Sequence, residues 1–274
     1  MDILKRNLSP LSDAAWTEVD ELFQTALTAN ISARRVVDVR GPHGWDYAAV
    51  PLGRLTIPEG QIDEGICFGI HRVQPLVEIR MPFTLGIWEL DDIDRGCRDP
   101  HLEPVVAAAK ALAAFEDMAV YGGFKAGSIT GLAEAAAGRY ALDNLKDEEV
   151  LLWTLSRAKR DFAAKGINGP FVLVAGRTLT ELLDTSMKGP IPLRKRVENL
   201  VESEIVYSPH FDGICLLSQR GGDGELTVGQ DFSIGYSHHD GQKVHLFAAA
   251  SFTFRLLTPE AVAVIDFTRT EKSE

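Results

Sequence analysis

The hydrophobic pattern predicts its clearest helix close to the N-terminus. Apolar side chains recur at steps of three and four residues from Trp16 through Phe23 to Leu27, and acidic residues lie between them. Ser12, directly before this run, is a residue type that caps helices by accepting a hydrogen bond from the first turn. The spacing therefore predicts an amphipathic helix over residues 13–29 that buries one face.

Two more helices are predicted in the middle of the chain. An acidic residue followed by Pro100 is typical of a helix start, and the alanine-rich apolar run after it ends at Gly122. A second helical pattern covers residues 147–165. After it, the continuous apolar run FVLVAG at 171–176 predicts a buried strand.

The C-terminal part of the chain is mostly of strand type. Residues 243–257 alternate between apolar and polar side chains, which predicts a strand with one buried face. The segment MPFTLGIWEL at 81–90 also has a strand-like composition, so we expect Trp88 in the core. These helices, strands and the mixed region between them indicate an α+β fold.

Residues 51–80 differ from the rest because short β-like runs alternate with glycine and proline. Nothing in this segment has the period of a helix. An isolated two-stranded hairpin is marginally stable in water, and fixing each residue costs about 1–2 kcal/mol of backbone entropy. We therefore expect this arm to pair with a neighbouring subunit.

The composition is that of a globular protein, since 45% of the 274 residues are hydrophobic and 24% are charged. Asp and Glu number 39 against 28 Lys and Arg, and the net charge of −11 argues against nucleic acid or an anionic membrane as a partner. Cys67, Cys97 and Cys215 are too widely spaced to indicate a disulfide framework or a structural zinc site. No apolar run reaches the length of a membrane span or signal peptide, so a cytoplasmic location is expected.

Motifs for catalysis are weak in this sequence. The glycine-rich segments at 122–127 and 221–224 lack the strand–loop–helix context of a phosphate-binding loop, and neither GxSxG nor HExxH occurs. The acidic runs at 89–94 and 147–149 are typical of solvated surface or of a helix N-terminus. A carboxylate pair within them would instead make the chain a small acidic hydrolase.

One cluster has metal-ligand side chains, namely His238, His239 and Asp240. Adjacent histidines of a strand point to opposite faces, which does not favour joint ligation. The motifs therefore predict no metal site and no enzyme.

Several long blocks of the sequence resemble the encapsulin family, whose older label is that of linocin-like bacteriocins. The blocks are LKRNLSPL (4–11), RRVVDVRGPHGWDYAAVPLG (34–53), PFTLGIWELDDIDRG (82–96), FEDMAVYGG (115–123), ITGL (129–132), RGGDGELTVGQDFSIGY (220–236) and SFTFRLLTPEA (251–261). They are spread over nearly the whole chain. Each block is long and distinctive, so the resemblance is strong.

The resemblance implies the major-capsid fold of tailed bacteriophages. It places the N-terminal helix and the start of the peripheral domain at 1–50, the extended loop or arm at 51–80, and the peripheral domain with its spine helix at 81–134. The axial domain is expected at 135–219 and the β tail of the peripheral domain at 220–274. The N-terminal helix stands where phage capsids have a removable segment, which favours a cellular compartment over a virus.

The resemblance also implies the function. Encapsulins form a closed icosahedral shell, a multiple of sixty subunits, in the cytoplasm. The shell encloses a cargo enzyme through its C-terminal targeting tail, commonly a ferritin-like protein for iron storage or a peroxidase against oxidative stress. The chain itself is then no enzyme and requires no cofactor. A phage or prophage capsid protein and the small acidic hydrolase are the alternatives.

The family pattern implies three groups of site residues. The cargo tail is expected in a groove of Phe23, Leu27, Asp38, Phe232 and Ile234, with ordinary core packing as the alternative. The turn Thr185, Ser186, Met187, Lys188, Gly189, Pro190 is expected to surround a five-fold pore, where a ring of Lys188 would favour anions, with a plain surface loop as the alternative. Trp88 and Arg80 match the flavin position of some members, although Pro82 departs from the commoner Thr or Val.

Overall fold

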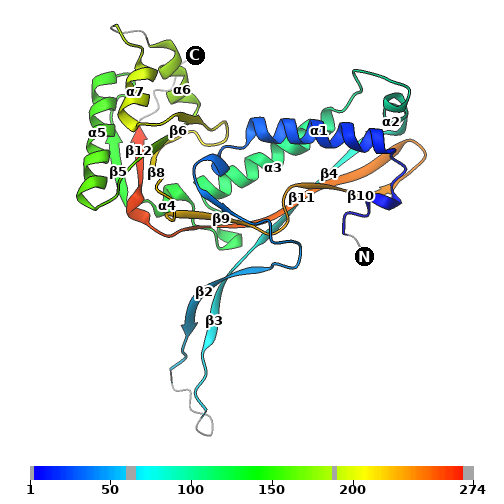
Figure 1. Cartoon of the computed structure of the whole chain (residues 1–274), viewed down its shortest axis with the longest axis horizontal. Coiled ribbons are helices and arrows are strands. Elements are labelled where there is room, and N and C mark those ends of the chain that lie inside the picture. The colour runs from blue at the N-terminus through cyan, green and yellow to red at the C-terminus, as the bar shows by residue number, and fades with distance from the viewer. Residues whose placement is uncertain (1–2, 60–65, 187–189, 268–274) are drawn as a thin grey trace.

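The computed structural model describes residues 3–59, 66–186 and 190–267, which form two domains with separate sheets and a protruding arm (Figure 1). The helices are α1 (Asp13–Asn30), α2 (Ile87–Asp94), α3 (Glu103–Tyr121), α4 (Leu132–Ala135), α5 (Glu148–Ala164), α6 (Arg177–Thr185) and α7 (Leu193–Val201), with the short 3-10 helices η1 (Arg6–Leu8), η2 (Ala33–Arg35), η3 (Lys125–Gly127) and η4 (Pro259–Ala261). The strands are β1 (Asp38–Arg40), β2 (Ala49–Thr56), β3 (Ile70–Pro75), β4 (Val77–Gly86), β5 (Gly138–Leu142), β6 (Phe171–Ala175), β7 (Ile205–Tyr207), β8 (Ile214–Ser218), β9 (Gly224–Val228), β10 (Ser233–His239), β11 (Lys243–Leu256) and β12 (Val262–Phe267).

The larger domain, here the peripheral domain, is built around the long strand β11. This strand pairs antiparallel with β4, β9 and β10, and β1 joins the other edge of β9 in parallel. Helix α3 packs on this sheet and α1 packs on α3, which gives three layers (Figure 1). The apolar stripe of α1 is buried as its spacing predicts, with Ser12 accepting the capping hydrogen bond from the Ala15 N–H.

The smaller domain, here the axial domain, has a five-stranded sheet in the order β5-β12-β8-β6-β7, packed against α5, α6 and α7. The prediction that residues 220–274 belong wholly to the peripheral domain is wrong for β12. That strand pairs in parallel with β5 and antiparallel with β8, so it lies inside the axial sheet. A strand buried on both faces and both edges suits its apolar run from Val262 to Ile265.

The axial sheet separates two hydrophobic cores. Val172 and Val174 of β6 point into the core of the peripheral domain, whereas Phe171, Leu173 and Ala175 point into the core beneath the axial helices. Side chains of a strand alternate between faces. Both faces are therefore apolar, which is why FVLVAG reads as a continuous run.

The arm is the two-stranded sheet of β2 and β3, which extends away from both domains (Figure 1). It ends earlier than expected. Residues 77–80 of the predicted arm belong to β4, whose Val77 and Ile79 pair with Phe252 and Ala250 of β11. The residues of the arm carry exposed apolar side chains, which are Leu55, Ile57, Ile66, Phe68, Ile70 and Val73.

Two local predictions were wrong at the start of helices. The spine helix α3 begins at Glu103 with Pro104 in its first turn, and not at Pro100. Residues 87–90 continue into α2 instead of extending the strand, and the side chain of Trp88 is 76% exposed. Only one side of this short helix faces the core, where Leu90 is buried, and Trp88 lies on the other side.

Candidate functional site

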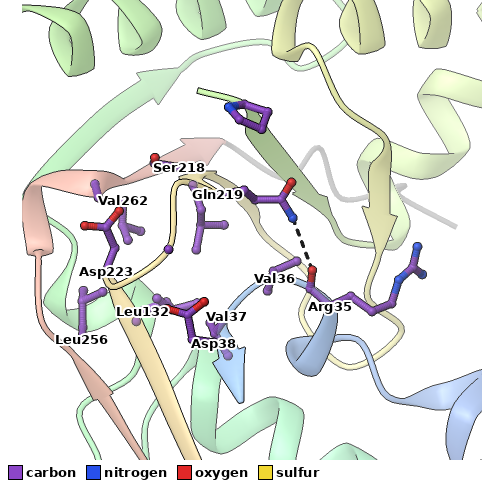
Figure 2. A pocket seen from close by; sticks show the side chains of 15 residues that line it. Arg35, Val36, Val37, Asp38, Leu132, Ser218, Gln219, Asp223, Leu256 and Val262 are labelled. Carbon is purple, nitrogen blue, oxygen red and sulfur yellow. Dashed lines mark hydrogen bonds between the residues drawn. The ribbon is translucent and has the colours of Figure 1, made fainter. Parts of the chain in front are cut away.

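A pocket of about 290 Å³ lies where β1, the turn before β9 and the start of β12 meet (Figure 2). Its lining residues are Arg35, Val36, Val37, Asp38, Leu132, Pro170, Leu217, Ser218, Gln219, Gly221, Asp223, Gly224, Leu256, Ala261 and Val262. Asp38 accepts a hydrogen bond from the Gly222 N–H, and the Gln219 side chain donates to the Arg35 carbonyl at 3.4 Å. The pocket thus combines an apolar wall with a few oriented polar groups.

The segment leading into β1 is fixed by two buried acids of the spine helix. Asp117 accepts hydrogen bonds from the Ser32 hydroxyl at 2.6 Å and from the Ala33 N–H at 2.8 Å. Glu116 is bonded to Arg34 through both carboxylate oxygens, at 2.7 and 2.8 Å. These bonds set the course of the chain between α1 and β1, and therefore the position of the pocket wall.

Burial dominates the electrostatics of this network. Desolvation raises the pKa of Glu116 and of Asp117, although the hydrogen bonds from Arg34 and Ser32 act in the opposite direction. Burial also disfavours the Arg34 cation, but its hydrogen bonds and charge interactions with Glu116 and Asp231 outweigh this cost and raise its pKa. Arg34 is therefore permanently charged, and its guanidinium also lies 4.7 Å from the Phe232 ring centre. The sequence signal for this network is a pair of acidic residues, Glu116 and Asp117, within an otherwise apolar helix.

The structure places four of the five predicted groove residues in the core. Phe23, Leu27, Phe232 and Ile234 are buried in the peripheral domain. The N-terminal segment covers β10, because the Tyr236 N–H donates to the Leu4 carbonyl and Arg6 Nε donates to the Ile234 carbonyl. These side chains pack as the core-packing alternative describes. Asp38 lines the pocket of Figure 2, and cargo binding by this set of five residues stays a prediction.

The predicted pore turn is described only at its two ends. Met187, Lys188 and Gly189 lie outside the described residues, Thr185 ends α6, and Pro190 is exposed. At the base of the turn the Ser186 hydroxyl bonds to Glu148, which also pairs with Arg196 at 2.9 Å. The acidic run at 147–149 forms a helix N-terminus, which is one of its two expected roles, because Asp147 caps α5 and Glu148 and Glu149 lie in its first turn. Glu148 is buried there and is not solvated.

The two residues of the predicted flavin position lie on consecutive elements. Arg80 lies on β4, where it pairs with Glu78 and stands over the Phe247 ring, and Trp88 lies on α2. The strand from Arg80 to the start of α2 spans about 20 Å at about 3.3 Å per residue. The exposed indole can stack on a planar ligand, and flavin binding by Trp88 and Arg80 stays a prediction.

Other candidate chemistry is accounted for by structural contacts. The acidic run on α2 makes hydrogen bonds to neighbouring segments. Asp94 accepts a hydrogen bond from the Ser12 hydroxyl, and Glu89 accepts one from the His101 N–H. His238 stacks on His245, and His239 bonds to the Tyr236 hydroxyl. Within the described ranges, no three His, Cys, Asp or Glu side chains are grouped to hold a metal ion. No helix of these ranges has the length and apolarity to cross a membrane.

Two solved structures share this fold. A virus-like particle from Pyrococcus furiosus aligns with a TM-score of 0.69 and 17% identity, covering 91% of this chain and 98% of that one. A Mycobacterium phage Bobi chain aligns with a TM-score of 0.59 and 14% identity over 88% of this chain and 91% of that one. The predicted tailed-phage capsid fold is thereby confirmed.

Sequence relatives are closer. The family described as "Encapsulating protein for peroxidase" matches residues 1–253. The type 1 encapsulin shell protein of Rhodospirillum rubrum is 45% identical over 267 residues, covering 95% of each chain. That of Mycobacterium tuberculosis is 37% identical over 262 residues, covering 95% of this chain and 98% of the other. These relatives are structural proteins and not enzymes. The chain has the capsid fold and an exposed arm, and its sequence matches these relatives over nearly the full length. This match shows that the chain belongs to the encapsulin family of shell proteins.

Proposed function

We propose that copies of this chain pair through their arms into a closed icosahedral shell, a multiple of sixty subunits, in the cytoplasm. The observation that carries this proposal is the row of apolar side chains exposed on β2, β3 and the segments beyond them. Monomeric proteins rarely expose so many large apolar residues together. Burying each one against a neighbour would contribute about 1.5–3 kcal/mol.

Electron microscopy of the purified chain expressed alone tests this proposal. Uniform closed particles with a mass in the megadalton range are expected. A monodisperse species of one or two chains, at the same concentration and in the same buffer, would contradict it.

The enclosed cargo is proposed to be a peroxidase that docks through its C-terminal tail. The family description names a peroxidase as the encapsulated protein, and a ferritin-like enzyme is the second candidate. β1 lies at one end of the strand path of its sheet, beside the pocket of Asp38. An extended peptide can add to such an edge through main-chain hydrogen bonds and place an apolar side chain in the pocket. One tail binds weakly, so an oligomeric cargo would gain avidity.

Two valines with the same exposure provide a matched test of this docking. Val39 on β1 and Val150 on α5 are each 42% exposed, so neither substitution disturbs the core. Val39→Asp shells are expected to assemble but to lose co-expressed tail-bearing peroxidase, whereas Val150→Asp shells retain it. If both variants retain cargo at the wild-type ratio, the tail binds elsewhere.

Transport through the wall is proposed to depend on Lys188. Like charges repeated around a narrow pore select against ions of the same sign. Lys188→Glu should therefore speed the uptake of divalent cations into loaded shells, with a difference that shrinks as salt rises. Equal uptake rates at low salt would remove this residue from the transport path.

A further inference from the structure

Three arginines from distant parts of the chain line one pocket at the base of the arm. They are Arg54 of β2, Arg72 of β3 and Arg255 of β11, and the pocket has a volume of about 460 Å³. The other lining residues are Leu52, Gln74, Ser128, Thr130, Ala135, Phe254, Leu256 and Leu257. The lining therefore holds three cations and no carboxylate.

The positive charge of this pocket is largely uncompensated. Arg54 and Arg72 make no ion pair with any residue that the structure describes. Arg255 bonds to Glu225 at 3.0 Å, but the same carboxylate also pairs with Arg40 at 3.2 Å. In addition, the buried Nε–H of Arg255 has no hydrogen-bond partner among the described residues.

The pocket is held in shape by the Gln74 side chain. Its amide nitrogen donates to the carbonyl oxygens of Ser128 and Phe254, both at 3.0 Å. These two bonds tie the arm to the end of β11 and to the turn after the spine helix. Arg72 is two residues away on the same face of β3, so it is positioned by the same attachment.

Like charges this close repel one another, and an anion between them would remove the repulsion. The guanidinium group presents paired N–H donors whose geometry matches the oxygens of phosphate and carboxylate groups. The chain has a net charge of −11, so a pocket lined by three positive side chains differs in sign from the protein as a whole. We propose that this arginine pocket is an oxyanion site that binds a phosphate or carboxylate group. The group has two possible sources, which are free phosphate and an acidic side chain of a second copy of this chain.

The test measures binding of inorganic phosphate to assembled shells by isothermal titration calorimetry, at low salt and without other oxyanions. The variants are Arg54→Gln with Arg72→Gln, and Arg160→Gln as a control at an exposed arginine of α5. With free phosphate as the ligand, wild-type and control shells show saturable binding near one phosphate per subunit. The double variant then binds at least tenfold more weakly.

A neighbour's carboxylate in the site gives a different result. Wild-type shells then show no phosphate binding, and the double variant dissociates at a lower urea concentration than wild type and control, or remains as subunits with native circular dichroism. If the glutamine pair does not fold, Arg54→Lys with Arg72→Lys keeps the charge but removes the planar fork, and the same weakening is expected.

Equal phosphate binding by wild type, double variant and control would overturn the proposed site. The site is also overturned if none of the three binds phosphate and all three shells dissociate at the same urea concentration. Only the carboxylate source rests on the proposed shell. Closed wild-type particles with no effect of the arginine variants would refute the oxyanion site alone, whereas absence of wild-type particles would refute the shell.

Discussion

The arm and the axial domain use apolar residues in opposite ways. The axial domain surrounds its own core, in which Leu155 of α5, Val197 of α7 and Leu216 of β8 are fully buried. The arm is a two-stranded sheet whose Leu55, on the other hand, is 50% exposed. The comparison shows that hydrophobic residues of one chain serve folding in one region and are left for assembly in the other.

Deleting residues 55–72 of the arm should have the largest effect, which is the loss of shell assembly. The deletion removes most of the exposed apolar side chains of the arm but no residue of either core. The subunits are therefore expected to fold but no longer to form shells. Size-exclusion chromatography checks the particle size, and circular dichroism checks that the domains remain folded. Intact shells from the deletion would show that the arm does not drive assembly.

Ile234→Asp is expected to prevent folding. Ile234 is 1% exposed beneath the N-terminal segment, and an unpaired carboxylate at such a position costs several kcal/mol. The measurement is the yield of soluble chain and its thermal unfolding, with Ile57→Asp on the exposed arm as the control for a folded subunit. Recovery of stable Ile234→Asp shells without cargo would instead return this residue to the docking groove.

A pair of identical substitutions sharpens the comparison further. Leu155→Ala should lower the unfolding free energy of the subunit by about 2–5 kcal/mol, because it leaves a cavity in the axial core. Leu55→Ala should change the same quantity by at most about 0.5 kcal/mol but make shells dissociate at lower urea. Urea unfolding of dissociated subunits and light scattering of shells separate the two effects. Similar losses in subunit stability would contradict the division of roles.

The smallest expected effect is a pH dependence within the axial domain. Burial, followed by its hydrogen bond to Asp161, raises the pKa of Tyr140 to about 12. Because the pKa is higher in the folded state, the stabilisation is complete below the unfolded value near 10 and is lost as pH rises towards 12. The absorbance difference between wild type and Tyr140→Phe should titrate with a midpoint near 12. A midpoint near 10 would show that neither burial nor the hydrogen bond to Asp161 raises the pKa of Tyr140.

Local pattern was sufficient for some of these features and insufficient for others. The helix α1 follows from its own periodicity, and the strand β6 follows from its continuous apolar run. The end of the arm could not be located, because only Leu76 separates β3 from β4 and the difference between them is the partner strand. The same holds for β12, whose place in the axial sheet depends on pairing with distant β5 and β8.

The candidate sites were harder to predict because they depend on contacts between distant segments. Ile234 is buried because the first residues of the chain lie across β10, which no local pattern indicates. Likewise, Arg54, Arg72 and Arg255 form no sequence motif, and only the fold brings them to one pocket. Asp38 was identified through the family resemblance, and its pocket became visible only with the turn at 219–224 in place.

Hydrogen–deuterium exchange of the arm tests the central claim most directly. Amides of residues 66–75 should exchange slowly in assembled shells and fast in subunits dissociated from them, because a neighbouring copy protects the arm only in the shell. Amides of β6 in the axial domain should exchange slowly in both states. Fast exchange of the arm in shells, equal to that in subunits, would contradict the account.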